Sequence, residues 1–172
     1  NDEVINQLIS LILQLDIEDN KSPIYLYINC VGGSVISGLA LFDIMNHIKS
    51  PIMTMNLGVA GSMASFLLAA GTKGSRMALP HSRVLMHQPM GSAQGSSLDI
   101  KAETEQLMRI KRTVIQNYAK MTNQSEFKIE KDIERDFFMS AEEALEYGII
   151  DYIVETENRQ DESNEHTHEL LT

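Results

Sequence analysis

Short apolar segments alternate with helical segments in the first half of this chain. Residues 24–28 (IYLYI) and 52–57 (IMTMNL) predict strands, and residues 37–47 predict a helix between them. Two strands that are connected through a helix run parallel, because the connection is a crossover rather than a tight hairpin. The alternation therefore predicts an α/β fold with a largely parallel sheet that is covered on both faces.

The other predicted elements continue this order. A helix with a broad apolar face is predicted for residues 4–15, and a second helix follows Ser62 and ends with Gly71 as its C-cap. A capping box at residues 140–143 (SAEE) predicts the last helix, which Gly148 closes. Further strands are predicted for residues 76–79, 83–87 and 149–154, and residues 89–97 are predicted to be a loop or a weak strand.

The longest helical pattern covers residues 98–121. Its second half carries an apolar stripe, whereas residues 99–106 in its first half are much more polar. At about 1.5 Å per residue this helix exceeds about 30 Å, so we expect part of it to project and to pack on another subunit. The apolar stripe consists of Leu107, Ile110, Val114, Tyr118 and Met121.

Length and charge exclude several functional classes. The 172 residues suit one domain, which we place at residues 1–154, and the net charge of −10 argues against a nucleic-acid partner. Half of that charge lies in residues 155–172, an acidic tail that we expect to be poorly ordered. No apolar run is long enough for a membrane span, and no signal peptide is visible.

The sequence offers no recognisable cofactor motif. Cys30 is the single cysteine, so an internal disulfide is impossible and an intracellular compartment is favoured. No group of histidine, cysteine and acidic residues has zinc-ligand spacing, and no glycine-rich phosphate motif occurs. We therefore expect neither a metal nor another cofactor.

Residues 58–71 (GVAGSMASFLLAAG) place Ser62 where a strand pattern changes into an apolar helix. A serine at such a position usually caps the helix, since its hydroxyl accepts a hydrogen bond from a free backbone N–H. A nucleophile is the alternative, because such a turn lies at the carboxyl end of a sheet, beside the free N–H groups of the helix. The local pattern alone favours the cap.

A nucleophilic serine needs a general base and an orienting carboxylate. Among the five histidines His87 is the best placed, because it ends an apolar strand and precedes a proline-marked bend. Asp136 precedes an apolar strand, but the pattern alone does not choose it over Asp132 or Asp151. The residues therefore allow a serine hydrolase without selecting its carboxylate.

Four separated motifs together resemble one known family. In chain order they are IYLYIN and GGS within residues 24–34, GSMA at residues 61–64, RVLMHQP at residues 83–89 and ERDFFMSA at residues 134–141. In order and spacing they resemble the proteolytic subunits of the Clp protease family, over residues 4–154. The resemblance implies an α/β fold of the ClpP/crotonase type, built of strand–turn–helix units with a projecting handle helix.

The resemblance also implies a serine endopeptidase without a cofactor of its own. In such an enzyme Ser62 is the nucleophile, His87 the general base and Asp136 the carboxylate that orients the imidazole. The backbone N–H groups of Gly33 and Met63 would form the oxyanion hole. The peptide would bind as an added strand between two segments, one of Gly33, Ser34 and Val35 and the other of Pro89, Met90 and Gly91.

Assembly is a further implication of the resemblance. Two seven-membered rings would stack into a tetradecamer and enclose a chamber in which unfolded polypeptides are cut into short peptides. The long helix and residues 91–97, expected as a strand, would join the rings, and Arg135 would pair with an acid of the opposite ring, for which we favour Asp99. An AAA+ Clp unfoldase, which uses ATP, would dock on the ring.

The chain departs from the family pattern at two turns. Val31 stands where a proline is usual, and Gly61 stands where an alanine is usual before the nucleophile. The N-terminal axial loop of the family has no counterpart before Asn1, and no targeting segment is visible. The expected compartment is the bacterial cytoplasm or an organelle of bacterial descent, either the plastid stroma or the mitochondrial matrix.

Two alternatives of different classes stay open at this point. A non-catalytic ring subunit of the same complex would assemble normally without cleaving peptides. An acyl-CoA enzyme of the related crotonase fold would also stabilise an oxyanion through backbone N–H groups, but it would need no Ser–His–Asp set. Reactivity of Ser62 towards serine-directed reagents distinguishes both from the peptidase.

Overall fold

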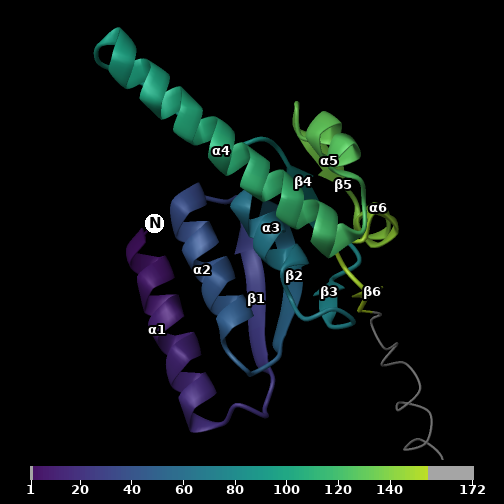
Figure 1. Cartoon of the computed structure of the whole chain (residues 1–172). Coiled ribbons are helices and arrows are strands. Elements are labelled where there is room, and N and C mark those ends of the chain that lie inside the picture. Colours follow the sequence, from purple (N-terminus) through teal and green to yellow (C-terminus); the bar gives the residue numbers. More distant parts are fainter. Residues whose placement is uncertain (1, 155–172) are drawn as a thin grey trace, which may run out of the picture.

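The computed structural model describes residues 2–154, in which helices pack around one six-stranded sheet (Figure 1). The acidic tail predicted for residues 155–172 lies outside the described residues. The strands are β1 (Ile24–Cys30), β2 (Ile52–Gly61), β3 (Arg76–Ala78), β4 (Arg83–Met86), β5 (Phe137–Met139) and β6 (Tyr152–Ile153). The helices are α1 (Asp2–Glu18), α2 (Val35–His47), α3 (Met63–Ala69), α4 (Ser97–Thr122), α5 (Glu126–Asp132) and α6 (Ala141–Tyr147).

The longest strand, β2, organises the sheet. One of its edges pairs in parallel with β1, while on the other edge its middle pairs with β3 and its end pairs with β4. β6 extends the sheet from β3 in parallel, and β5 pairs antiparallel with β4. The predicted α/β class with largely parallel strands is therefore confirmed, with β4 and β5 as the antiparallel exception.

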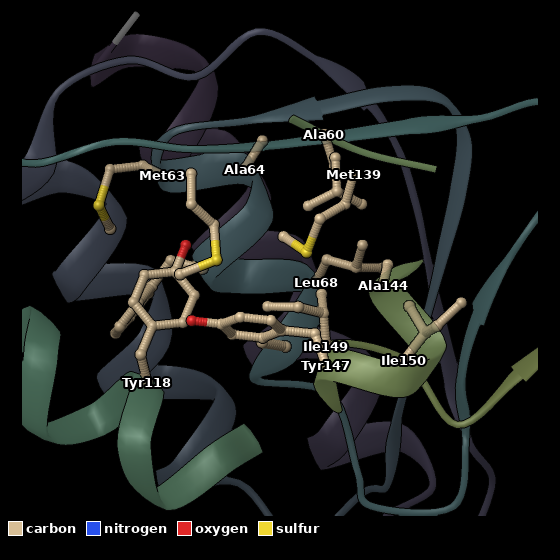
Figure 2. Close-up of a cluster of buried hydrophobic side chains, with 14 of the residues drawn as sticks. Ala60, Met63, Ala64, Leu68, Tyr118, Met139, Ala144, Tyr147, Ile149 and Ile150 are labelled. Carbon is tan, nitrogen blue, oxygen red and sulfur yellow. The ribbon is translucent and has the colours of Figure 1, made fainter. Parts of the chain in front are cut away.

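Two apolar clusters form the core. The smaller cluster lies where α1 and α2, which run side by side in Figure 1, pack near β1 and the start of β2. The larger cluster surrounds α3, whose seven residues are all buried, as expected for a helix that is apolar on nearly every side. Figure 2 shows Tyr118 of α4 and Tyr147 of α6 reaching into the larger cluster beside Met63, Ala64 and Leu68 of α3.

The long helix α4 packs on the body only through its second half, and its first half projects (Figure 1). Residues 97–106 are all exposed, whereas Val114, Ile115 and Tyr118 are buried. Ser96 and Asp99 form a capping box at its start, which gives the exposed first turn hydrogen bonds of its own. The projecting helix is thus confirmed, and its packing on another subunit stays a prediction.

Two expected strands differ in the structure. Residues 91–96 form no strand, since none of the strands within residues 2–154 pairs with them and an isolated strand has no partner for its backbone groups. The predicted strand over residues 149–154 is shortened to β6. Ile149 and Ile150 instead donate their N–H groups to the Ala144 carbonyl, so they belong to the end of α6.

Two helix predictions also need correction. Gly71 is not the C-cap of α3, because Ala70 takes that position in the right-handed helical conformation. A Cβ atom on Gly71 would instead collide with the side chain of Thr54, so the glycine permits close packing. Helix α5 was not predicted, because it is a single short segment in which only Ile129 is buried.

Candidate active site

The register of the sheet brings Ser62 and His87 to the same edge. Ser62 directly follows β2, and His87 directly follows the neighbouring strand β4. Gly61 pairs with Leu85, and the N–H of Ser62 donates to the Leu85 carbonyl at 2.8 Å. Because His87 lies two residues beyond Leu85, the nucleophile candidate stands beside the end of the strand that carries the base candidate.

Asp136 reaches the same place from the other side of β4. Met86 pairs with Phe137 in the antiparallel ladder, so His87 and Asp136 face each other one residue beyond that pair. His87 Nδ1 lies 3.5 Å from Asp136 Oδ1, which is an ion-pair distance when the imidazole is protonated but is longer than a good hydrogen bond. The His87 side chain is 20% exposed, whereas that of Asp136 is 63% exposed.

The other two aspartates that the sequence left open have different partners. Asp132 accepts hydrogen bonds from Lys128 and from the Tyr147 hydroxyl. Asp151 forms an ion pair of 2.6 Å with the buried side chain of Arg76. Of the three aspartates, Asp136 is therefore the one that contacts His87.

The backbone of Ser62 is strained and its hydroxyl does not cap a helix. Ser62 has φ 52° and ψ −122°, which an L-residue adopts at a cost of about 1–3 kcal/mol. It occupies the N-cap position of α3, yet its side chain makes no capping hydrogen bond. The cap favoured by the local pattern is therefore wrong, and the hydroxyl remains available for chemistry.

The glycine segment after β1 lies against this serine. Gly32 has φ 111°, and a Cβ atom placed on it would lie 2.7 Å from the Ser62 Cβ. No heavy atom lies within 4 Å of a Cβ placed on Gly33, so that residue borders open space. Met63 is the first residue of α3, where backbone N–H groups have no partner inside the helix. Of the two residues expected to form an oxyanion hole, Met63 directly follows the serine, and Gly33 follows the glycine that lies against it.

The residues expected to hold a peptide lie in two irregular segments. The Ser34 side chain is the N-cap of α2 and accepts from the Ser37 N–H, and Val35 begins that helix. Residues 87–96 have no regular structure, and Met90 is 75% exposed there. A Cβ on Gly91 would contact Leu107, so this segment passes along α4.

The two residues expected at a ring contact, Asp99 and Arg135, form no ion pair within residues 2–154. Asp99 accepts hydrogen bonds from the Ser96 hydroxyl and N–H, which together lower the pKa of its carboxyl. Arg135 is exposed and has no ion pair among residues 2–154. Both side chains therefore remain accessible to a neighbouring molecule.

Comparison with known sequences identifies the family of this chain. A sequence model of the Clp protease family matches residues 1–157. The chain belongs to the Clp protease family. ATP-dependent Clp protease proteolytic subunit 2 of Prochlorococcus marinus (strain NATL2A) is 52% identical over 155 residues, which cover 90% of this chain and 78% of that protein. Proteolytic subunit 3 of Synechococcus sp. (strain CC9605) is 49% identical over 159 residues, covering 92% and 80%.

Membership in this family confirms several expectations. As a Clp protease proteolytic subunit the chain is a serine-type endopeptidase, so the family decides against the acyl-CoA enzyme. The family also implies assembly into rings that work with Clp ATPases. The cyanobacterial relatives indicate a bacterial or plastid origin.

Clp proteases typically work without a bound cofactor. Within residues 2–154 no cluster of three or more histidine, cysteine or acidic side chains could hold a metal ion. None of the described helices combines the length and the apolar character that a membrane crossing needs. These two findings concern the described part of the chain.

Sequence reasoning overlooked two polar residues beside the site, Ser65 and Tyr118. Ser65 is fully buried in α3, and its hydroxyl contacts the carbonyl oxygens of Ser62 and Leu85 and the Tyr118 hydroxyl. The available signal was a lone serine in the apolar segment MASFLLA. A buried hydroxyl in such a segment must find hydrogen-bond partners.

Proposed function

We propose that Ser62 is the nucleophile of this Clp protease subunit, with His87 as its general base and Asp136 as the orienting carboxylate. The observation that carries the proposal is the contact between His87 Nδ1 and Asp136 at the end of the strand beside Ser62. Since Nδ1 faces the carboxylate, Nε2 remains for the serine hydroxyl. The uncapped hydroxyl and strained backbone of Ser62 support the same role.

Acylation follows from these positions. His87 Nε2 takes the proton of the Ser62 hydroxyl while Oγ attacks the carbonyl carbon of the peptide bond. The carbonyl oxygen becomes an oxyanion, which accepts hydrogen bonds from the N–H groups of Gly33 and Met63. His87 then gives its proton to the departing amine, and the peptide C–N bond breaks to leave an ester on Ser62. The carboxylate of Asp136 stabilises the transient imidazolium.

Deacylation repeats these steps with water. His87 takes a proton from a water molecule that attacks the ester carbon, and the same two N–H groups stabilise the second oxyanion. The proton then returns to Ser62 Oγ as the C–O bond breaks. The products are two shorter peptides, and the enzyme regains its neutral histidine without any cofactor.

The substrate peptide is extended and adds a strand between residues 33–35 and 89–91. Neither segment pairs with a strand within residues 2–154, and although the Ser34 carbonyl accepts the Gly38 N–H of α2, Gly33 and residues 89–91 have no backbone partner there that would compete with a peptide. Binding through backbone hydrogen bonds suits a peptidase that accepts many sequences. Gly33, next to open space, gives the peptide carbonyl close access to Ser62.

The proposed assembly is a tetradecamer of two stacked heptameric rings, in which the projecting half of α4 joins the rings. Its exposed apolar residues support this role, since Leu98 is 76% and Ile100 is 42% exposed. Arg135 and Asp99 would pair between rings. An AAA+ unfoldase would supply unfolded chains with its own ATP, in the bacterial cytoplasm or the plastid stroma.

The test is labelling of the assembled protein with a serine-directed fluorophosphonate, followed by intact-mass measurement. We expect one adduct on the native chain and none on Ser62→Ala, whose peptide cleavage should also fall by about 10⁴-fold or more. Ser82→Ala is the control, because Ser82 is a buried serine whose hydroxyl has no hydrogen-bond partner within residues 2–154. An adduct on Ser62→Ala, or none on the native assembly, contradicts the proposal.

A further inference from the structure

We infer that Ser65 and Tyr118 form a buried clamp that positions Ser62 relative to the strand carrying His87. The inference rests on the proposed role of Ser62 as nucleophile and adds two positioning residues to it. Neither residue touches the reacting atoms. They act through the backbone on which those atoms stand.

The clamp joins the two chain segments that carry the proposed nucleophile and base. The Ser65 hydroxyl lies 2.6 Å from the carbonyl oxygen of Ser62 and 2.9 Å from that of Leu85 in β4. The Leu85 carbonyl also accepts the Ser62 N–H at 2.8 Å. One hydroxyl thus touches both the strained turn and the strand that ends just before His87.

The hydrogen-bond directions follow from the number of protons available. A serine hydroxyl has one proton, which Ser65 shares between two carbonyl acceptors, so its remaining capacity is that of an acceptor. Tyr118 lies 2.8 Å away and must therefore donate its phenolic proton to Ser65 Oγ. This bond orients the Ser65 hydroxyl toward the two carbonyls, so that Tyr118 acts through Ser65.

Burial makes the arrangement rigid. Ser65 is 0% and Tyr118 is 2% exposed, so water does not compete for these bonds. The Tyr118 ring stands edge-on against Phe66, with centroids 5.1 Å apart, which holds the phenol in place. Burial also raises the pKa of Tyr118 far above the physiological range, so the phenol keeps the proton that it donates.

The experiment measures the rate of fluorophosphonate labelling of Ser62, together with kcat and KM for a short peptide. Loss of one buried hydrogen bond at the turn should slow labelling about tenfold in Ser65→Ala and about threefold in Tyr118→Phe. In both variants kcat should fall by the same factor with KM unchanged, since the turn rather than peptide binding is altered. The double variant should be as slow as Ser65→Ala alone.

Two substitutions serve as matched controls. Ser82→Ala removes an equally buried serine hydroxyl that has no partner. Tyr147→Phe removes a buried phenol hydroxyl that donates to Asp132 instead of to the turn. Both should label at the native rate, and equal slowing in Tyr147→Phe and Tyr118→Phe would mean that general destabilisation is responsible, which overturns the clamp.

The outcomes separate this inference from the proposed function. If the native assembly labels at Ser62 but Ser65→Ala labels equally fast, the clamp is wrong and the nucleophile assignment stands. If native protein does not label at Ser62, the proposed function itself fails, and the clamp with it. Should Ser65→Ala not fold, Tyr118→Phe decides, because it keeps the ring that packs on Phe66.

Discussion

The serine side and the carboxylate side of the site differ in how firmly the chain holds them. The backbone of Ser62 is fixed by a hydrogen bond to Leu85, by the buried hydroxyl of Ser65 and by close contact with Gly32. Asp136 follows α5 on an exposed segment, and its side chain is 63% exposed at 3.5 Å from His87. The serine side is held by buried packing and hydrogen bonds, whereas the carboxylate side is held by one solvent-exposed contact between Asp136 and His87.

This difference indicates which part of the active site a single chain can hold in place and which part it cannot. Buried hydrogen bonds hold a strained turn in a lone subunit, but an exposed ion pair contributes little fixed geometry. The residue next to the carboxylate, Arg135, is exposed and has no ion pair within the described residues. The proposed ring contact at Arg135 would therefore fix the part of the site that the single chain leaves loose.

The largest expected effect is on the carboxylate side. Asp136→Asn should lower kcat for peptide cleavage by the assembled enzyme about 10³-fold, because the imidazolium loses its counter-charge. In dissociated subunits the same change should slow labelling of Ser62 less than about threefold, since the contact is loose there.

Asp132→Asn is the matched control for that prediction. Asp132 is the last residue of α5, just before the connection that carries Asp136, but it bonds Lys128 and Tyr147, so its loss should leave kcat within about twofold. If Asp136→Asn lowers the reactivity of the assembled and the dissociated protein by the same factor, assembly does not fix the carboxylate side of the site.

A smaller effect is expected on the serine side from Gly32→Ala. The new methyl group would collide with the Ser62 Cβ and displace the turn, which should lower kcat about 10²-fold. Gly74→Ala is the control, because Gly74 also has a positive φ but borders open space away from the site. Both variants carry the cost of a side chain at positive φ and Gly32→Ala adds the collision, but only Gly32→Ala should lose cleavage. If Gly32→Ala retains cleavage, the close approach of Gly32 to Ser62 does not determine the position of the nucleophile.

The smallest effect concerns the stability that the Arg76–Asp151 ion pair gives to the serine side, and how that stability changes at low pH. Arg76 donates to the Ala69 carbonyl at the far end of α3 and pairs with Asp151. Burial alone would raise the pKa of Asp151, but the hydrogen bonds and charge of Arg76 outweigh it and lower that pKa below its ordinary 3.8. The stabilisation is therefore present above pH 3.8 and is lost as the pH falls through the lower folded-state value.

The contribution of the Arg76–Asp151 ion pair to stability can be measured by thermal unfolding. Asp151→Asn should lower Tm by about 5 °C at pH 7, and its difference from the native protein should narrow as the pH falls below about 4. Asp43→Asn, at an exposed aspartate, should leave Tm within about 1 °C throughout. A difference that stays constant down to pH 2 would show that ionisation of Asp151 is not involved.

Much of the fold was predictable because its signals are local. The apolar stripe of the long helix and the capping box at Ser140 and Glu143 both appear in the structure as predicted. Helix α5 escaped prediction although Ser125 caps it, because a seven-residue helix with Ile129 as its one buried residue shows no apolar period. The family resemblance implied a strand over residues 91–97, but a strand depends on a partner edge, and no strand within residues 2–154 pairs with this segment.

The candidate site was less predictable, because its geometry is set by contacts between distant segments. Whether the Ser62 hydroxyl caps α3 depends on its φ of 52°, which β4 and the glycine segment impose. The choice of Asp136 over Asp132 depends on the pairing of β4 with β5. Family resemblance named these residues, whereas residue types and spacing alone did not.

The closeness of Gly61 to Val31 has an evolutionary consequence. A Cβ atom on Gly61 would lie 2.7 Å from the Val31 carbonyl oxygen, so alanine there requires the turn to move away. These are the two positions at which the resemblance leads us to expect a different residue, proline at position 31 and alanine at position 61. We therefore expect the two positions to be coupled, with glycine before the nucleophile permitting the present shape of the facing turn. Alanine at position 61 alone should displace that turn, and it should be tolerated only when the residue at position 31 changes as well.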